Sequence, residues 1–232
     1  NRTAFVNRLD GLVVGAAAKA GVFLDHRFVH PDLYFAVTFP KTWKYENSPT
    51  AVVAYPQSES AMLGLQVLAE GDDPAAVADE IGAQVELLDR SEVKKINGLP
   101  VVTANTRVVQ DGQELSLSLT WIAKDGLIYQ VLGATPSARW TEFRSTFEAA
   151  AATFRRPSES ELDEVRENRL RLVAANRGET LSAVAKRAKS QWSVERVAAA
   201  NAMDATEKLR GGEAIKVSKR EPYAPAADEP SQ

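Results

Sequence analysis

The sequence predicts an α+β chain in which an antiparallel sheet with covering helices is followed by a small βααβ unit. Three observations indicate this fold class. Asn97-Gly98, Asp111-Gly112 and Asp125-Gly126 each separate two β-like runs, and such pairs supply the positive φ angles of a two-residue hairpin turn. Apolar and polar residues alternate over 115–121, which is typical of a strand with one buried face. A helix predicted over 137–154 carries its aromatic rings on one stripe, which would cover the sheet.

The composition is that of a globular protein and excludes several classes. The chain has 232 residues, 44% of them hydrophobic, and no cysteine, which excludes a disulfide scaffold, a thiol nucleophile and cysteine-ligated zinc. Its net charge of −3 argues against a general nucleic-acid binder. The stretch 169–219 nevertheless holds eleven Lys and Arg against five Asp and Glu, a net of +6 that leaves −9 for the rest. This asymmetry predicts two units with different partners.

Residues 1–20 are interpreted as a linker or the end of an upstream helix, because glycines and alanines interrupt their helical spacing. The longest apolar run there, Leu12–Ala18, is far too short for a membrane span. From residue 21 onward the sequence pattern changes to short β-like runs separated by prolines. These runs are Val22–Val29, Tyr34–Phe39, Trp43–Glu46, Ala51–Tyr55 and Met62–Ala69.

A helix is predicted over Pro74–Leu88, where Asp73 would cap it and Pro74 suits its first turn. Strands then resume at Val93–Ile96 and Leu99–Val109, and the helix over 137–154 closes an α+β domain of residues 21–156. Its stripe consists of Trp140, Phe143, Phe147 and Phe154.

A charged linker helix is expected over 157–168, and the βααβ unit over 169–218. Its elements are a strand at Leu170–Ala174, helices starting at Thr180 and Ser193, and a strand at Ala214–Val217. The expected core is Leu181, Val184, Val197, Leu209, Ile215 and Val217. The proline-rich tail 219–232 is predicted to be disordered.

The unit 169–218 resembles a LysM domain. The resemblance is carried by the run from Val173 to Leu181 and the run from Leu209 to Val217, with Asn201 between them. It implies binding of N-acetylglucosamine-containing glycans, such as peptidoglycan, in a shallow groove. The implied groove residues are Gly178, Glu179, Thr180 and Leu181 on one side and Asn201, Ala202, Met203 and Asp204 on the other. Backbone amides would bind acetamido groups, and Leu181 or Met203 would touch their methyls.

This sequence departs from the LysM pattern at two places. The connection 188–193 is longer than usual and carries Trp192, and Glu179 stands where Asp is commoner. Trp192 is compatible with helix packing or with an exposed sugar platform. The unit as a whole is compatible with glycan binding or with a packing and docking role alone.

The whole arrangement resembles the C-terminal region of bacterial periplasmic zinc metallopeptidases, the HEXXH enzymes related to HtpX, BepA and the CAAX prenyl protease. The run from His30 to Trp43, Asn97–Val101 and the terminal LysM-like unit carry this resemblance. The first of these runs also resembles PsbP-like domains, which implies a sheet with helices. No His-Glu-x-x-His motif occurs in the chain, so the resemblance implies that the zinc-binding catalytic domain lies upstream of Asn1.

We therefore expect a non-catalytic accessory region in the periplasm or cell envelope, without catalytic or metal-binding residues and without a cofactor of its own. Its expected partners are peptidoglycan, the upstream protease domain and envelope proteins. The alternative is a self-standing cell-wall-binding or envelope-assembly protein without protease activity.

Other candidate sites are weaker. His26 and His30 are the only histidines, and in an extended segment residues four apart lie roughly 13 Å apart, too far to share a metal. No Gly-x-Ser-x-Gly elbow is present, and Gly211-Gly212 precedes a strand, which does not suit a phosphate loop. Carboxylate pairs such as Asp72-Asp73 and Asp79-Glu80 are interpreted as helix caps or as solvated charge. The aromatics between Tyr34 and Trp43 are interpreted as core, with a ligand groove as the alternative.

Overall fold

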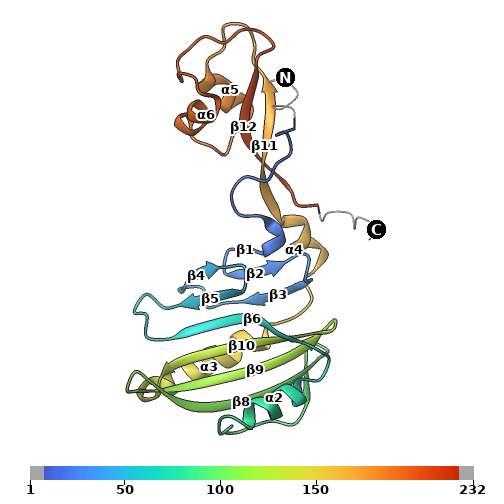
Figure 1. Cartoon of the computed structure of the whole chain (residues 1–232), viewed down its shortest axis with the longest axis vertical. Helices are drawn as coiled ribbons and strands as arrows, with labels where there is room; N and C mark the ends of the chain where they lie inside the picture. Colours follow the sequence, from blue (N-terminus) through green and yellow to red (C-terminus); the bar gives the residue numbers. More distant parts are fainter. Residues whose placement is uncertain (1–7, 225–232) are drawn as a thin grey trace. The chain divides into compact units, whose positions relative to one another are not determined.

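The computed structural model describes residues 8–224, which form two compact units (Figure 1). The sheet unit comprises residues 20–158, and the βααβ unit comprises residues 8–19 together with 159–224. Antiparallel sheets with helices packed on them confirm the predicted α+β class. Within residues 8–224, no helix has the length and apolar character needed to cross a membrane.

Two antiparallel sheets make up the sheet unit. The smaller sheet consists of β1 (Val22–Leu24), β2 (Arg27–His30) and β3 (Phe35–Thr38), in that order. The larger sheet has the order β4 (Lys44–Asn47), β5 (Ala51–Tyr55), β6 (Met62–Glu70), β10 (Leu127–Pro136), β9 (Gln113–Lys124), β8 (Leu99–Gln110) and β7 (Lys94–Ile96). Two short 3-10 helices are η1 (Ala18–Ala20) and η2 (Ser137–Arg139).

The three predicted hairpin turns are present and set the strand register. Asn97 and Gly98 have φ angles of 50° and 82°, and the two Asp-Gly pairs adopt nearly the same values. These angles fit the type I′ turn, whose twist matches that of the flanking strands. The turns place Ile96 opposite Leu99, Gln110 opposite Gln113, and Lys124 opposite Leu127.

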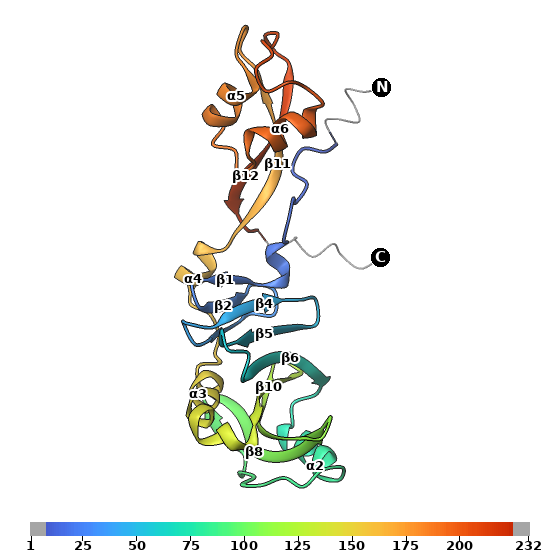
Figure 2. The same ribbon diagram turned by 90° about the vertical axis from the view of Figure 1, so that its left-hand side faces the viewer.

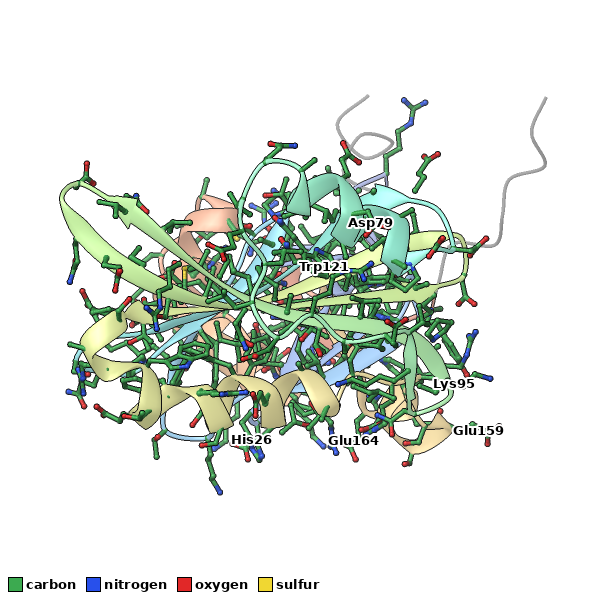
Figure 3. The ribbon with its side chains drawn as sticks, turned by 90° about the horizontal axis from the view of Figure 1, so that it is seen from below. His26, Asp79, Lys95, Trp121, Glu159 and Glu164 are labelled. Atoms are coloured by element: carbon green, nitrogen blue, oxygen red, sulfur yellow. The ribbon has the colours of Figure 1, made fainter. Side chains whose placement is uncertain are left out.

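Helices cover both faces of the larger sheet. Figures 2 and 3 show α2 (Pro74–Gly82) and α3 (Trp140–Ala152) on opposite sides of the strands. Trp121, labelled in Figure 3, is fully buried in the cluster that includes Ala78 of α2. On the other face, the predicted aromatic stripe joins the larger core cluster, which confirms its covering role, although the α-helix spans Trp140–Ala152 and not 137–154, so Phe154 lies just beyond it.

The expectation of one buried face for 115–121 was wrong. Ser116, Ser118 and Thr120 are buried, as are Leu119 and Trp121, and Leu117 is half-buried. The Ser116 hydroxyl lies 2.9 Å from that of Ser137 in η2, so the second face is covered by the segment that leads into α3. Small hydroxyl side chains suit that face because they leave room for a close helix.

Gly133 in β10 shows how closely α3 approaches the sheet. A Cβ atom built there would lie 2.2 Å from the Phe147 ring, a distance that no packed side chain tolerates. The phenyl ring therefore rests directly on the Gly133 backbone, and the helix is held against the strand.

The first helix is shorter than predicted. Asp73 accepts a hydrogen bond from the Ala75 amide at 2.8 Å, which confirms the cap, but α2 ends at Gly82 and not at Leu88. Leu88 pairs with Asn105 through two backbone hydrogen bonds of 2.7 and 2.8 Å. Because Leu88 pairs with β8, the segment after Gly82 is extended and does not continue the helix.

The βααβ unit contains α4 (Glu159–Glu164), β11 (Arg166–Ala174), α5 (Leu181–Arg187), α6 (Val194–Asn201) and β12 (Ala214–Pro222). Thr180 and Ser193 cap α5 and α6, so both helices begin where they were predicted to start. All of the expected core residues are buried in one cluster. The strands β11 and β12 pair along their whole lengths.

The expected boundaries of this unit need three corrections. β11 begins at Arg166, inside the predicted linker helix 157–168, and pairs with β12 up to Pro222, inside the predicted disordered tail 219–232. Residues 8–19, expected as a linker, lie along β11: the Gly11 amide donates to Leu170 O at 2.8 Å. All three boundaries are determined by hydrogen bonds between segments that are far apart in the sequence, and local sequence patterns do not reveal such pairing. Residues 1–7 and 225–232 lie outside the described residues.

Candidate functional site

The turn between β11 and α5 is fixed by the side chain of Glu179. Its carboxylate accepts hydrogen bonds from the Asn176 amide at 2.8 Å and from Arg187 Nε and Nη2 at 2.9 and 2.8 Å. Because Arg187 and this amide stabilise the charged form, the pKa of Glu179 falls to about 2. Gly178 has a φ of +78° with open space around it, so conformation and not crowding favours glycine there.

The turn pairs with the far end of the loop between α6 and β12. The Gly178 amide donates to Leu209 O at 2.9 Å, and the Leu209 amide donates to Glu179 O at 2.8 Å. A further isolated bridge joins Thr180 to Lys208. The main chain of residues 178–180 is therefore paired with residues 208–209, at the end of the loop that begins with the predicted groove residues 201–204.

The side chains of two predicted groove residues serve the fold. Leu181 is fully buried in the core, so its side chain cannot touch a ligand. Met203 packs against the same core but is only partly buried, so of these two residues it alone could make the apolar contact. The Asn201 amide group donates to Val197 O and Lys216 O at 2.8 and 3.0 Å, and its oxygen accepts from the Lys216 amide at 2.9 Å. Asn201 thus ties α6 to β12.

The remaining predicted residues shape the backbone. Thr180 accepts from the Ala183 amide at 3.3 Å as the α5 cap. Ala202 ends α6 in the left-handed conformation with φ of 55°. The Asp204 carboxylate accepts from the Thr206 amide and hydroxyl at 2.8 and 2.5 Å, which holds the start of the loop. All three support the predicted groove by positioning main chain.

An open hollow lies where the turn meets the loop. It has a volume of about 540 Å³ and is lined by Arg177, Gly178, Leu209, Arg210 and Gly211; we call it the arginine hollow. Arg177 and Arg210 are exposed, and neither guanidinium forms an ion pair or hydrogen bond within residues 8–224. The hollow is therefore cationic. Sequence reasoning detected the basic excess of this unit but did not single out these two arginines.

Trp192 packs at the edge of the core. Its side chain is partly buried against the core of the βααβ unit, and the Arg196 guanidinium lies 5.1 Å from the centre of its ring. These contacts favour the helix-packing interpretation of Trp192, because a sugar platform needs a free ring face.

The two histidines do not come together with other ligands. His26 Nδ1 lies 2.7 Å from the Asp25 carboxylate, and His30 Nδ1 accepts the Leu33 amide at 3.1 Å. Over residues 8–224, no group of three or more His, Cys, Asp or Glu side chains is arranged to hold a metal ion. The residues of this stretch thus do not suit the zinc of a metallopeptidase.

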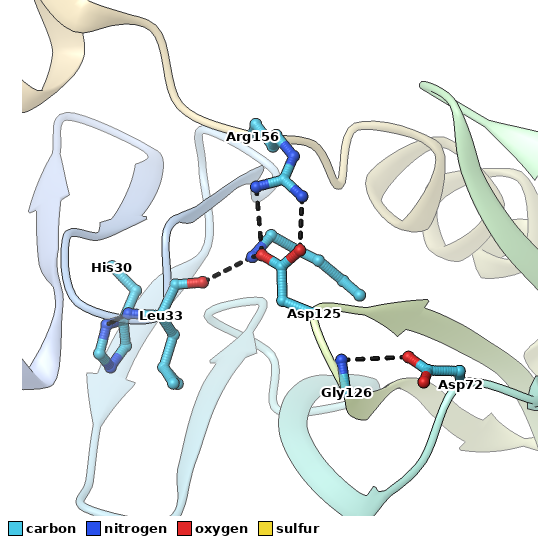
Figure 4. Close-up of polar contacts among 7 residues, drawn as sticks. His30, Leu33, Asp72, Asp125, Gly126 and Arg156 are labelled. Carbon is cyan, nitrogen blue, oxygen red and sulfur yellow. Dashed lines mark hydrogen bonds and ion pairs between the residues drawn. The ribbon is translucent and has the colours of Figure 1, made fainter.

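The aromatics between Tyr34 and Trp43 have different surroundings. Phe35, Phe39 and Trp43 are buried in the core cluster, Phe35 also lines a pocket of the sheet unit, and Tyr34 is 38% exposed. Asp72 accepts the Gly126 amide at 3.1 Å, so this carboxylate braces the turn between β9 and β10 (Figure 4).

Comparison with known proteins gives distant structural likenesses. No protein family and no curated protein matches the chain. The chain is similar to cyanobacterial PsbP (CyanoP) from Synechocystis sp. PCC 6803, with 16% identity over 62% of this chain and 99% of that one and a TM-score of 0.44. A Bacteroides thetaiotaomicron VPI-5482 protein shows 11% identity over 85% and 87%, with a TM-score of 0.47. LpqN, involved in cell envelope biogenesis of Mycobacterium tuberculosis, shows 10% identity over 53% and 83%, with a TM-score of 0.35.

One of these structures bears the name of the PsbP-like family that the sequence resembles. The α+β architecture rests on the strands and helices of this chain itself.

Proposed function

We propose that the βααβ unit binds an anionic, N-acetylglucosamine-containing glycan, peptidoglycan being the expected one, at the arginine hollow. The observation that carries the proposal is the pair of exposed guanidinium groups of Arg177 and Arg210, which have no ion-pair partner among residues 8–224 and lie beside the turn that the LysM resemblance singles out. Guanidinium groups bind carboxylates through paired hydrogen bonds, and the stem peptides of peptidoglycan carry carboxylates.

Preorganisation supports this proposal. Glu179, Thr180 and Asp204 hold the turn and the loop through side-chain hydrogen bonds to the main chain, so the backbone near the hollow is fixed before a ligand arrives. A fixed backbone loses little conformational freedom on binding, which favours recognition of acetamido groups by amides. Met203 would supply an apolar contact at the start of the same loop.

The test is sedimentation of the full chain with insoluble peptidoglycan. We expect Arg177→Ser combined with Arg210→Ser to reduce the bound fraction several-fold, and the binding of the unmodified chain to weaken as salt rises. The matched control removes the same charge from the same unit as Lys189→Ser with Arg220→Ser, both exposed positions. Equal loss in both double variants would show only non-specific attraction to a basic unit and would overturn the assignment of the hollow.

In its broader form, the proposal makes the chain a non-catalytic region of a periplasmic or envelope zinc metallopeptidase, with the sheet unit contacting the protease domain or envelope proteins. The rival is a self-standing wall-binding or envelope-assembly protein. The coding sequence upstream of Asn1 decides between them: a His-Glu-x-x-His helix supports the first, and a signal peptide ending near Asn1 supports the second. Chelator-sensitive proteolysis by the pure chain would contradict the non-catalytic role.

A further inference from the structure

The sheet unit contains a pocket that the glycan proposal does not use. It has a volume of about 300 Å³, within the usual range for small-molecule sites, and opens between the smaller sheet and the β4–β5 hairpin. Its apolar lining includes Phe28 and Phe35 of the smaller sheet and Leu65 and Tyr129 of the larger one. The turn after Asn47 forms its polar rim.

Aromatic rings are grouped in the lining. The Phe35 ring centre lies 6.0 Å from that of Phe28, 5.4 Å from that of His30 and 5.2 Å from that of Tyr129. Phe35 also stacks on Phe154 at 5.1 Å, which fixes its plane from behind. A flat ring entering the pocket therefore meets other rings in tilted and edge-on arrangements, which aromatic pairs prefer.

One wall of the pocket is locked by polar contacts. The Leu33 amide donates to His30 Nδ1 at 3.1 Å, and the Leu33 carbonyl accepts from Lys124 Nζ at 2.8 Å (Figure 4). Lys124 is itself neutralised by Asp125 at 2.6 Å, which also pairs with Arg156. Hydrogen bonds thus hold both the amide and the carbonyl of Leu33, so this wall is in place before a ligand binds.

The lining carries no charge at neutral pH. His30 and Tyr129 are its only ionisable side chains. Burial lowers the pKa of His30, which favours its neutral form, and burial together with nearby Asp125 raises the pKa of Tyr129 to about 12. An ion entering the pocket would lose hydration without gaining a counter-charge, so the lining selects against ions.

One polar group in the lining lacks a partner. Tyr129 is 1% exposed, and its hydroxyl forms no hydrogen bond with any of residues 8–224. Its oxygen retains accessible surface, so it is free to hydrogen-bond with water or with a molecule in the pocket. A ligand oxygen would supply that partner.

We propose that this pocket binds a small, neutral, largely aromatic molecule whose single oxygen exchanges a hydrogen bond with the Tyr129 hydroxyl. The ring cluster selects the aromatic part, the uncharged lining excludes anions and cations, and the unpaired hydroxyl orients the oxygen. The site is independent of glycan binding, because all the residues that line it belong to the sheet unit.

The experiment titrates the full chain with 1-naphthol, its anionic analogue 1-naphthoate and oxygen-free naphthalene, followed by amide NMR shifts. We expect 1-naphthol to shift amides of residues 28–35, 47–52 and 65–67, and 1-naphthoate to bind at least tenfold more weakly. Tyr129→Phe keeps the ring and should weaken 1-naphthol about two- to tenfold while leaving naphthalene unchanged.

A second variant tests the location. Ala51→Trp places a bulky ring at the rim and should abolish 1-naphthol binding, whereas the matched Ala76→Trp on the exposed side of α2 should not. If Ala51→Trp fails to fold, Tyr129→Phe alone decides. The proposal is overturned if 1-naphthol shifts no pocket amides, if 1-naphthoate binds equally well, or if Tyr129→Phe binds 1-naphthol unchanged.

Discussion

Replacing Asn201 with Ala separates a structural role of this side chain from a ligand-binding one. The substitution removes three hydrogen bonds of 2.8, 3.0 and 2.9 Å, two of them with the main chain of Lys216 in β12. Each is worth about 0.5–1.5 kcal/mol net, and the Lys216 main chain is left unpaired. The higher helix propensity of Ala offsets about 0.5 kcal/mol. We expect the βααβ unit to lose about 2–3 kcal/mol.

Native-state hydrogen exchange of the full chain measures this loss within one unit. At about 1.4 kcal/mol per tenfold, the Ile215 and Val217 amides should exchange about 30- to 150-fold faster in Asn201→Ala. Amides of β9 and β10, in the sheet unit, should keep their rates. Asn176→Ala is the matched control: that side chain is exposed, so the variant should stay within about 0.5 kcal/mol of the wild type.

If Asn201→Ala exchanged at wild-type rates but lost glycan binding, the side chain would be a ligand-binding group, as the LysM resemblance implied, and not a brace between α6 and β12.

Three further predictions use the same structure. Gly133→Ala should destabilise the sheet unit by about 1–3 kcal/mol in urea unfolding, because its Cβ would meet the Phe147 ring at 2.2 Å; a neutral effect would contradict the close helix approach. The Glu179 carboxyl should titrate near pH 2 by NMR, and titration near 4.5 would disprove its pairing with Arg187. Because its pKa is lower in the folded than in the unfolded state, the carboxylate stabilises the turn above the unfolded pKa and loses this effect as the pH falls through 2. Met203→Asp should lower peptidoglycan sedimentation, unlike exposed Ala199→Asp.

Much of the fold was predictable because its signals are local. Asn97-Gly98 and the two Asp-Gly pairs determine hairpins through backbone conformation alone, and the aromatic stripe of α3 determines which side of that helix is buried. The order of strands in the sheet depends on long-range pairing, such as β6 with β10, which no local pattern specifies. The pairing of residues 8–19 with β11 was missed for the same reason.

The candidate site was predictable only in outline. The resemblance located the turn at Gly178 and the loop after Asn201, but hydrogen-bond geometry decides what each side chain does. Asn201 and Leu181 prove to be occupied by the fold, whereas the guanidinium groups of Arg177 and Arg210 form no ion pair with residues 8–224, although the Glu213 carboxylate accepts the Arg210 main-chain amide at 3.2 Å. The pocket of the sheet unit arises from rings on β2, β3 and β10, which are distant in sequence.

The most direct test of the account is an NMR titration of the full chain with a soluble peptidoglycan fragment that carries both the disaccharide and the stem peptide. We predict shifts confined to amides of residues 176–181 and 202–213, lost in the Arg177→Ser, Arg210→Ser double variant. Absence of shifts there at millimolar fragment, or shifts only in residues 20–158, would contradict glycan recognition by the βααβ unit.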